Sequence, residues 1–121
     1  MLPKPAAGDL RTLPERRRYG RKQREFLRSL ATNAVIDEHR RSPQPGQRSE
    51  ALERLMVYFQ REAAADGYAV LVVKPFEAYR LVENARGLGL GPRALDDQFY
   101  ASPEEAEHGL FLRRIHDLFE T

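Results

Sequence analysis

The stretch SPEEAEHGLFLRRIHDLFE, residues 102–120, contains the strongest local folding signal in the chain. Ser102 is a preferred N-cap residue, Pro103 suits the first helical position, and Glu105 can close a capping box. Apolar residues then recur at helical spacing. The predicted buried stripe consists of Phe111, Ile115, Leu118 and Phe119. This stretch therefore predicts a C-terminal helix that anchors the hydrophobic core.

The segments before this helix alternate between strand and helix signals. Tyr68–Val73 is a continuous apolar run between a glycine and a proline, which predicts a strand buried on both faces. Pro75 at a helical first turn predicts a helix that ends near Arg86, with Phe76, Tyr79 and Val82 as its apolar edge. A glycine-rich loop, residues 87–92, follows. Gln98–Ala101 is then expected to form a short second strand that pairs with the first.

Two further helices are predicted in the N-terminal half. The first runs from Pro14 to about Arg40 and ends before the Pro- and Gly-containing loop at residues 42–47. The second begins after Ser49, a good N-cap, and ends near Ala65, before a glycine stop signal. The expected buried faces are Leu27, Leu30, Ala31 and Ala34 in the first helix, and Leu52, Leu55, Met56 and Phe59 in the second.

These elements together predict an α+β fold that is predominantly α-helical, with about four helices and two short β-strands. A chain of 121 residues has room for one hydrophobic core. We therefore expect a single helix-rich domain over residues 14–121. Residues 1–13 mix proline, glycine and charge without apolar periodicity, which predicts a flexible N-terminal arm.

Composition narrows the chemistry and the location. The chain has no cysteine, so disulfides, thiolate metal sites and cysteine nucleophiles are excluded. No apolar run approaches the roughly 20 residues that span a bilayer, and the N-terminus lacks a secretory apolar segment. We therefore expect a cytoplasmic protein that does not bind membranes.

Charge is unevenly distributed although the formal net charge is only +2. Residues 1–50 contain 12 Lys/Arg and 6 Asp/Glu, and the remainder is net acidic. The arginines at the basic face of the first helix are Arg17, Arg21, Arg24 and Arg28. This basic arm suits either an acidic protein surface or a polyanion. A nucleic-acid-binding helical module that uses the Arg17–Arg28 face is the alternative hypothesis, although nearly all the aromatic interleaving of single-strand binders is absent.

No catalytic, cofactor-binding or metal-binding residue is predicted in this chain. His39, His108 and His116 form no HExxH arrangement, and Glu105 with His108 supplies only one of the two Glu-x-x-His pairs that a carboxylate-bridged metal pair needs. The serines lack a nucleophile elbow and the glycine-rich loop lacks a phosphate-loop ending. Asp96 and Asp97 are better explained as turn residues than as an acid and base pair.

From about Leu55 to Ile115 the sequence resembles the small (alpha) subunit of N,N-dimethylformamidase-like amide hydrolases. The resemblance begins with Tyr58 and Phe59 and continues through the strand that starts at Tyr68. It then includes Glu77, Ala78, Tyr79, Arg80 and Leu81, followed by Leu95, Asp96 and Phe99. The most specific part is the closing helix, which carries Glu104, Glu105, Ala106, His108, Phe111, Leu112, Arg113, Arg114 and Ile115.

The resemblance implies that catalysis belongs to a large partner subunit that holds a single iron ion through tyrosine and carboxylate side chains. No iron ligand is carried over to this chain. The chain is then expected to be a non-catalytic companion that stabilises the large subunit in a hetero-oligomer such as α2β2 or a larger assembly. The complex would hydrolyse the C–N bond of N-substituted amides.

Eight residues are candidates for the interface with that large subunit: Tyr68, Phe76, Tyr79, Arg80, Phe99, Phe111, Arg113 and Arg114. Aromatic and arginine side chains are enriched among residues that dominate binding energy. The apolar residues of the last helix do not lie on one narrow stripe, so we expect one face inward and one against a neighbour. The alternative is that Arg113 and Arg114 cover the domain's own core.

Overall fold

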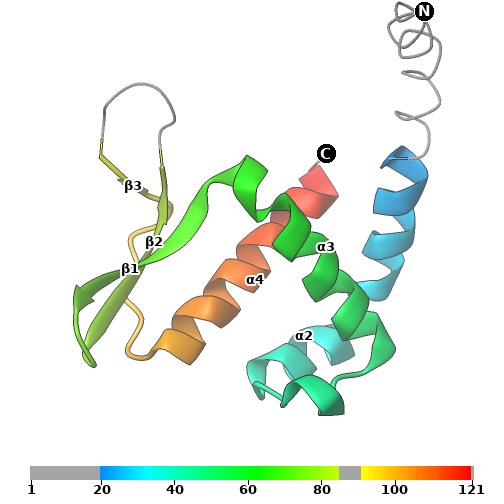
Figure 1. The fold of residues 1–121 in the computed structure, drawn as a ribbon, viewed down its shortest axis with the longest axis horizontal. Helices are drawn as coiled ribbons and strands as arrows, with labels where there is room; N and C mark the ends of the chain where they lie inside the picture. The colour runs from blue at the N-terminus through cyan, green and yellow to red at the C-terminus, as the bar shows by residue number, and fades with distance from the viewer. Residues whose placement is uncertain (1–19, 85–90, 121) are drawn as a thin grey trace, which may run out of the picture.

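The computed structural model describes residues 20–84 and 91–120 of the chain (Figure 1). The predicted arm, the start of the first helix and most of the glycine-rich loop lie outside these residues. The described elements are a helical segment at residues 20–30, α2 (Asn33–Arg40), a 3-10 helix η1 (Pro45–Gln47), α3 (Glu50–Asp66), β1 (Tyr68–Lys74), β2 (Ala78–Glu83), β3 (Arg93–Ala94) and α4 (Pro103–Glu120). The predicted α+β class, dominated by helices, is confirmed. No helix in the described ranges is long and apolar enough to cross a membrane.

The first predicted helix is broken in two, so the prediction of one continuous helix to Arg40 is wrong. Residues 31–32 leave the helical conformation, and Thr32 becomes the N-cap of α2 by accepting a hydrogen bond from the Val35 N–H. A threonine side chain competes with helix hydrogen bonding and favours such a start. The break also turns Val35 into the core and leaves Ala34 exposed.

The predicted signals of α3 are confirmed at both ends. The Ser49 hydroxyl accepts from the Leu52 N–H, and its own N–H and hydroxyl donate to the Glu38 carboxylate at 2.7 and 2.6 Å. Gly67 ends the helix with φ of 71°, a left-handed conformation that glycine adopts without strain. Glu38 thereby ties α2 to the start of α3.

Residues 75–84, the described part of the helix predicted to start at Pro75, are not helical. Pro75 opens a tight turn, in which Phe76 has φ of 66°, and the chain returns as β2 antiparallel to β1. In β2 the side chains of Tyr79, Leu81 and Val82 are buried, so both faces of the strand are covered at Leu81 and Val82. Phe76, the first residue of the predicted helical edge, is instead 91% exposed. Pairing with β1 satisfies the backbone hydrogen bonds of this segment, so its contact with β1 determines that it forms a strand.

The predicted strand at Tyr68–Val73 is confirmed as β1, but it is not buried on both faces, because residues 71–74 are exposed. The sheet order is β1-β2-β3, so β1 is an edge strand of the described sheet. Residues 98–101 do not pair with β1 as predicted. Tyr100 instead forms an isolated bridge with Tyr79 of β2.

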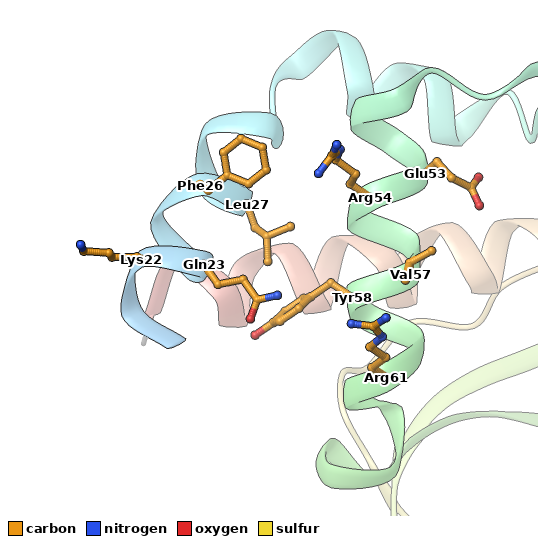
Figure 2. Close-up of a pocket in the computed structure, with 9 residues that line it drawn as sticks. All are labelled: Lys22, Gln23, Phe26, Leu27, Glu53, Arg54, Val57, Tyr58 and Arg61. Atoms are coloured by element: carbon orange, nitrogen blue, oxygen red, sulfur yellow. The ribbon is translucent and has the colours of Figure 1, made fainter. Parts of the chain in front are cut away.

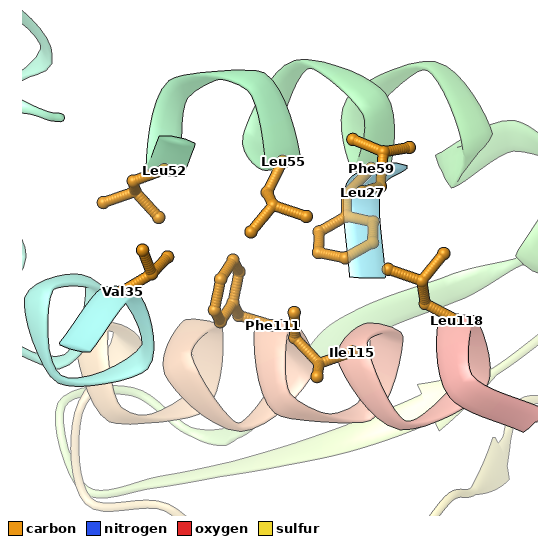
Figure 3. Packing of buried hydrophobic residues seen from close by; sticks show 8 residues of the cluster. All are labelled: Leu27, Val35, Leu52, Leu55, Phe59, Phe111, Ile115 and Leu118. Atoms are coloured by element: carbon orange, nitrogen blue, oxygen red, sulfur yellow. The ribbon is translucent and has the colours of Figure 1, made fainter. Parts of the chain in front are cut away.

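The helix α4 lies between two clusters of buried side chains. Towards α3 it contributes Phe111, Ile115 and Leu118 to a helical core (Figure 3). The other members of that core are Leu27, Val35, Leu52, Leu55 and Phe59. Towards the sheet it contributes Ala106 and Leu110 to a second cluster with Tyr79 and Leu81. Both apolar faces of α4 are therefore covered by this chain itself, and Phe119, predicted to be buried, is 54% exposed.

Gly109 allows the segment before α4 to approach the helix closely. A Cβ atom at this position would lie 2.8 Å from the Tyr100 ring. The missing side chain thus lets Tyr100 pack directly on the α4 backbone while its own backbone bonds to β2.

Candidate partner interface

The eight predicted interface residues fall into three classes of exposure. Tyr79 and Phe111 are core residues, only 6% and 4% exposed, which leaves little of either ring for a partner. Phe76 and Phe99 are exposed aromatic rings on the sheet side of the molecule. The half-buried candidates are Tyr68, Arg80, Arg113 and Arg114. The structure thus separates residues that build the core from residues that present a surface.

Arg80 and Phe99 form one paired feature of that surface. The guanidinium of Arg80 lies 4.8 Å from the centroid of the Phe99 ring, and its Nη2 donates to the Asp96 carbonyl at 2.9 Å. Asp96 itself accepts from the Gln98 N–H at 3.0 Å, which is the turn role expected for this aspartate. The turn therefore holds the Phe99 ring against the Arg80 guanidinium, while Phe99 remains 60% exposed.

Tyr68, Asp117, Arg113 and Arg114 form a second cluster where β1 meets α4. The Tyr68 hydroxyl donates to the Asp117 carboxylate, and both guanidinium groups lie about 6 Å from the Tyr68 ring, at 5.8 and 6.0 Å. Burial, followed by the hydrogen bond to Asp117, raises the pKa of Tyr68. The hydrogen bond with Tyr68 raises the pKa of Arg113. Both arginines therefore make contacts within the chain.

The predicted basic arm is divided by the structure. Arg17 lies outside the described residues, Arg21 is exposed and Arg24 is half-buried. The Arg28 Nε donates to the Leu118 carbonyl at 2.8 Å and thereby satisfies a carbonyl in the last turn of α4. Arg28 therefore has a structural role, and the described part of the helix does not present four equivalent arginines to a polyanion.

A groove of about 470 Å³ separates the helical segment at residues 20–30 from α3 (Figure 2). Lys22, Arg54 and Arg61 carry positive charge around it, and Phe26 and Val57 expose 49% and 39% of their surface. The remaining lining residues are Gln23, Leu27, Glu53 and Tyr58. Arg54 lies 5.8 Å from the Phe26 ring centroid and bonds to Glu50 at 2.7 Å. Sequence periodicity missed this groove because it arises from two helices that meet only in the fold.

His39 and His108 form a pair that the sequence analysis did not predict. Their Nδ1 atoms lie 2.8 Å apart, and the His39 ring stacks on Phe111 with centroids 3.9 Å apart. Burial lowers the pKa of His39 to about 4, and it lowers the pKa of His108 as well. Both imidazoles are therefore neutral near pH 7, and one N–H is shared between them.

The described residues do not fit an iron site of tyrosine and carboxylate ligands. Two tyrosine–carboxylate pairs exist, Tyr68 with Asp117 and Tyr100 with Asp96, but each is a phenol that donates a hydrogen bond to its carboxylate. Burial, with the bond to Asp96, raises the pKa of Tyr100 to about 12, which opposes the phenolate form that binds a metal. Within residues 20–84 and 91–120, no group of three His, Cys, Asp or Glu residues could hold a metal ion. Glu105 takes part in capping α4, because its N–H donates to the Ser102 hydroxyl and its carboxylate accepts from the Ala101 N–H, one residue before the predicted N-cap.

Comparison with known proteins identifies the family. The family model of the N,N-dimethylformamidase alpha subunit matches residues 15–121. The N,N-dimethylformamidase alpha subunit of Paracoccus aminophilus is 34% identical over 104 residues, which cover 83% of this chain and 72% of that protein. The protein of the same name from Alcaligenes sp is 31% identical over 86 residues, which cover 69% of this chain and 64% of its own length. The resemblance inferred from residues 55–115 is confirmed, and the chain belongs to the N,N-dimethylformamidase alpha subunit family.

Proposed function

We propose that this chain is the small, non-catalytic subunit of a two-subunit, cytoplasmic amidohydrolase that cleaves the C–N bond of N-substituted amides. The observation that carries the proposal is the family match over residues 15–121. Both relatives are named as one subunit of N,N-dimethylformamidase, which supports a second kind of chain as the partner. The catalytic iron is assigned to that large subunit, because the donor groups described here do not fit it.

The groove between residues 20–30 and α3 is the surface that we assign to the large subunit. Lys22 and Arg61 carry positive charge beside the exposed side chains of Phe26 and Val57, while Arg54 is paired with Glu50 of its own helix. This combination suits an acidic segment with apolar side chains on the partner. The charged rim would direct encounter, and burial of Phe26 and Val57 would supply affinity. Arg80 with Phe99, on the sheet side of α4, is a second contact of the aromatic and arginine type found at binding hot spots.

The first experiment compares the chain alone with the chain co-expressed with its large subunit. We expect the isolated chain to hydrolyse no N-substituted amide and to retain no stoichiometric iron. The two chains together should elute as one active hetero-oligomer, with its mass measured by light scattering. Turnover by the isolated chain, or elution of the two chains as separate species, would contradict the proposal.

Charge reversal tests the assigned groove. Arg61→Glu should weaken assembly about 10-fold or more if the partner is acidic there, measured by titration of the large subunit. Arg93→Glu is the matched control, because Arg93 lies on β3, on the other side of α4, and is 79% exposed. Equal effects of the two reversals would move the interface away from the groove.

A further inference from the structure

The outer edge of β1 carries backbone groups that β2 does not use. The Asn84 N–H donates to the Gly67 carbonyl at 3.1 Å, and Tyr79 exchanges both backbone hydrogen bonds with Tyr100 at 2.9 and 2.8 Å. The Leu95 N–H donates to the Leu81 carbonyl at 2.9 Å. Tyr79 and Leu81 thus direct their backbone groups away from β1. Hydrogen-bonded and non-hydrogen-bonded pairs alternate along an antiparallel ladder.

In β1, Val72 lies opposite Tyr79 and Val70 lies opposite Leu81. The N–H and C=O groups of Val72 and Val70 must point away from β2, towards the edge where the described sheet ends. The Val70 side chain is partly buried against the second cluster and lines a groove of about 610 Å³ between α3 and α4. The strand therefore offers two donors and two acceptors to another strand.

The side chains along this edge are apolar and exposed. Leu71, Val72 and Val73 are exposed by 42%, 53% and 49%, and Phe76 at the hairpin turn is 91% exposed. A long apolar edge strand in contact with water is rare in isolated domains, because it pairs with other strands. Strands that stay unpaired usually carry charges, prolines or bulges along the edge. In Tyr68–Lys74 the single charge and the register shift between Val72 and Lys74 both lie at the end of the strand.

We propose that β1 pairs with β1 of a second copy of this chain, antiparallel and centred on Leu71, to form a continuous six-stranded sheet. The proposal rests on the proposed function, because it sets how two small subunits meet in an assembly such as α2β2. Leu71 is the middle residue of Tyr68–Lys74, so this register gives the longest overlap. Any other centre leaves part of the apolar edge uncovered.

This register is self-complementary in hydrogen bonds and in packing. Val70 lies opposite Val72 of the second copy, and Val72 opposite its Val70, so the four outward backbone groups of each strand are satisfied. On the other face of the sheet, Leu71 meets Leu71. Val73 lies at a register shift between Val72 and Lys74, where the regular pairing of β1 ends. Leu71 and Val72 therefore gain apolar neighbours across a two-fold axis.

Charge does not oppose this register. Residues 68–73 carry no charge, and Lys74 at the end of the strand pairs with Glu77 of its own hairpin at 2.7 Å. A second copy is favoured over a strand of the large subunit, because Val70 and Val72 offer the same outward backbone groups to each other about Leu71.

Cross-linking tests the axis directly because the natural chain has no cysteine. Leu71→Cys should form a disulfide-linked dimer under mild oxidation in the full chain and in the complex, since non-hydrogen-bonded antiparallel pairs bring their Cβ atoms within disulfide range. Phe76→Cys is the matched control, because position 76 is more exposed but lies away from the axis. Faster cross-linking of Phe76→Cys than of Leu71→Cys would overturn the proposed register.

Light scattering of two lysine variants separates this proposal from the proposed function. Leu71→Lys places two positive charges on the axis and should halve the mass of an α2β2 assembly to αβ, without loss of the large subunit. Val57→Lys, in the groove of Figure 2, should release the large subunit and leave the β1 contact intact. Circular dichroism melts verify that both variants fold. An unchanged α2β2 mass for Leu71→Lys, or loss of the large subunit alone, would overturn pairing through β1.

Discussion

The Nδ1 atoms of His39 and His108 lie 2.8 Å apart and join α2 to α4, although 69 residues separate them in the chain. The pair is neutral in the folded protein chiefly because burial penalises a charged imidazole, and a proton on both rings would also remove the shared hydrogen bond and add like charges. Charges nearby act in the same direction on both rings, since Arg48 lowers the pKa of His39 and Arg40 that of His108. Asp37 raises the pKa of His108, but it is the smallest of the three influences.

Stability should therefore fall as the pH is lowered. Both histidines have folded-state pKa values below the ordinary value of 6.5, and that of His39 is about 4. Above pH 6.5 neither state binds the proton, so the folded protein suffers no penalty. Between about pH 6.5 and 4 the unfolded chain takes up protons that the folded chain does not, which favours unfolding. We expect a loss on the order of 1–2 kcal/mol after allowance for the partly exposed ring.

The measurement is urea unfolding at pH 7.5 and pH 4.5. His39→Leu should reduce the difference between the two pH values. His116→Gln should leave the difference unchanged, because His116 is 61% exposed near the end of α4. An equal reduction by both variants would show that His39 is not the group that titrates.

Replacement of Gly109 by alanine should destabilise the protein although alanine is the better helix former. The new Cβ would lie 2.8 Å from three atoms of the Tyr100 ring, a contact that forces the ring or the helix to move. We expect a loss of about 1–3 kcal/mol, typical of overpacking, against a gain in helix propensity of up to about 1 kcal/mol.

Two controls define that result. Gly46→Ala should have little effect, because no atom lies within 4 Å of a Cβ built there. Tyr100→Ala combined with Gly109→Ala should cost less than the sum of the two single changes, since the clash needs both partners. If the two costs add in the double variant, the effect of Gly109→Ala does not come from contact with Tyr100.

Arg28→Ala should weaken the attachment of the N-terminal helix to the end of α4. The substitution removes the hydrogen bond from Nε to the Leu118 carbonyl, a charge-assisted bond between residues 90 positions apart. We expect a loss of about 1–2 kcal/mol in the free energy of unfolding. Arg21→Ala, at an exposed position of the same helical segment, should change it by less than about 0.5 kcal/mol. Equal losses for Arg28→Ala and Arg21→Ala would show that Arg28 does not stabilise the end of α4 through this hydrogen bond.

Nucleic acid binding should be weak and lack the steep salt dependence of a phosphate-tracking helix. Arg28 is bonded to α4 and Arg24 is half-buried, so few of the predicted arginines can contact phosphates together. Filter binding of single- and double-stranded DNA at 50 and 200 mM salt measures this. Micromolar retention at the lower salt that disappears at the higher would restore the nucleic-acid hypothesis.

Local signals in the sequence predicted much of the fold correctly. Ser49, Gly67 and Ser102 act through groups within a few residues, so their capping roles are visible without the structure. The helix predicted to start at Pro75 was wrong, because proline suits both the first turn of a helix and a β-turn. Only the pairing of the following residues with β1 decides between the two. The break at Thr32 was missed because the surrounding apolar residues keep helical spacing across it. The N-cap hydrogen bond to the Thr32 hydroxyl is a weaker sequence signal than that spacing.

The candidate site was less predictable than the fold. Aromatic and arginine residue types identified Phe99 with Arg80, but the same rule selected Tyr79 and Phe111, which build the core. Residue type alone does not show whether a ring is covered by its own chain. The groove beside Val57 and the His39–His108 pair depend on helix packing across the sequence, for which no local signal exists.

The position of α4 between both hydrophobic clusters affects synthesis of the protein. Neither cluster is complete without α4, which supplies Phe111 and Ile115 to one and Leu110 to the other. A nascent chain that has emerged only as far as Ala101 therefore has two open apolar surfaces, and α4 must leave the ribosome before either surface is covered. A premature stop codon before Ala106 would consequently leave a species for proteases and chaperones, not a shortened subunit.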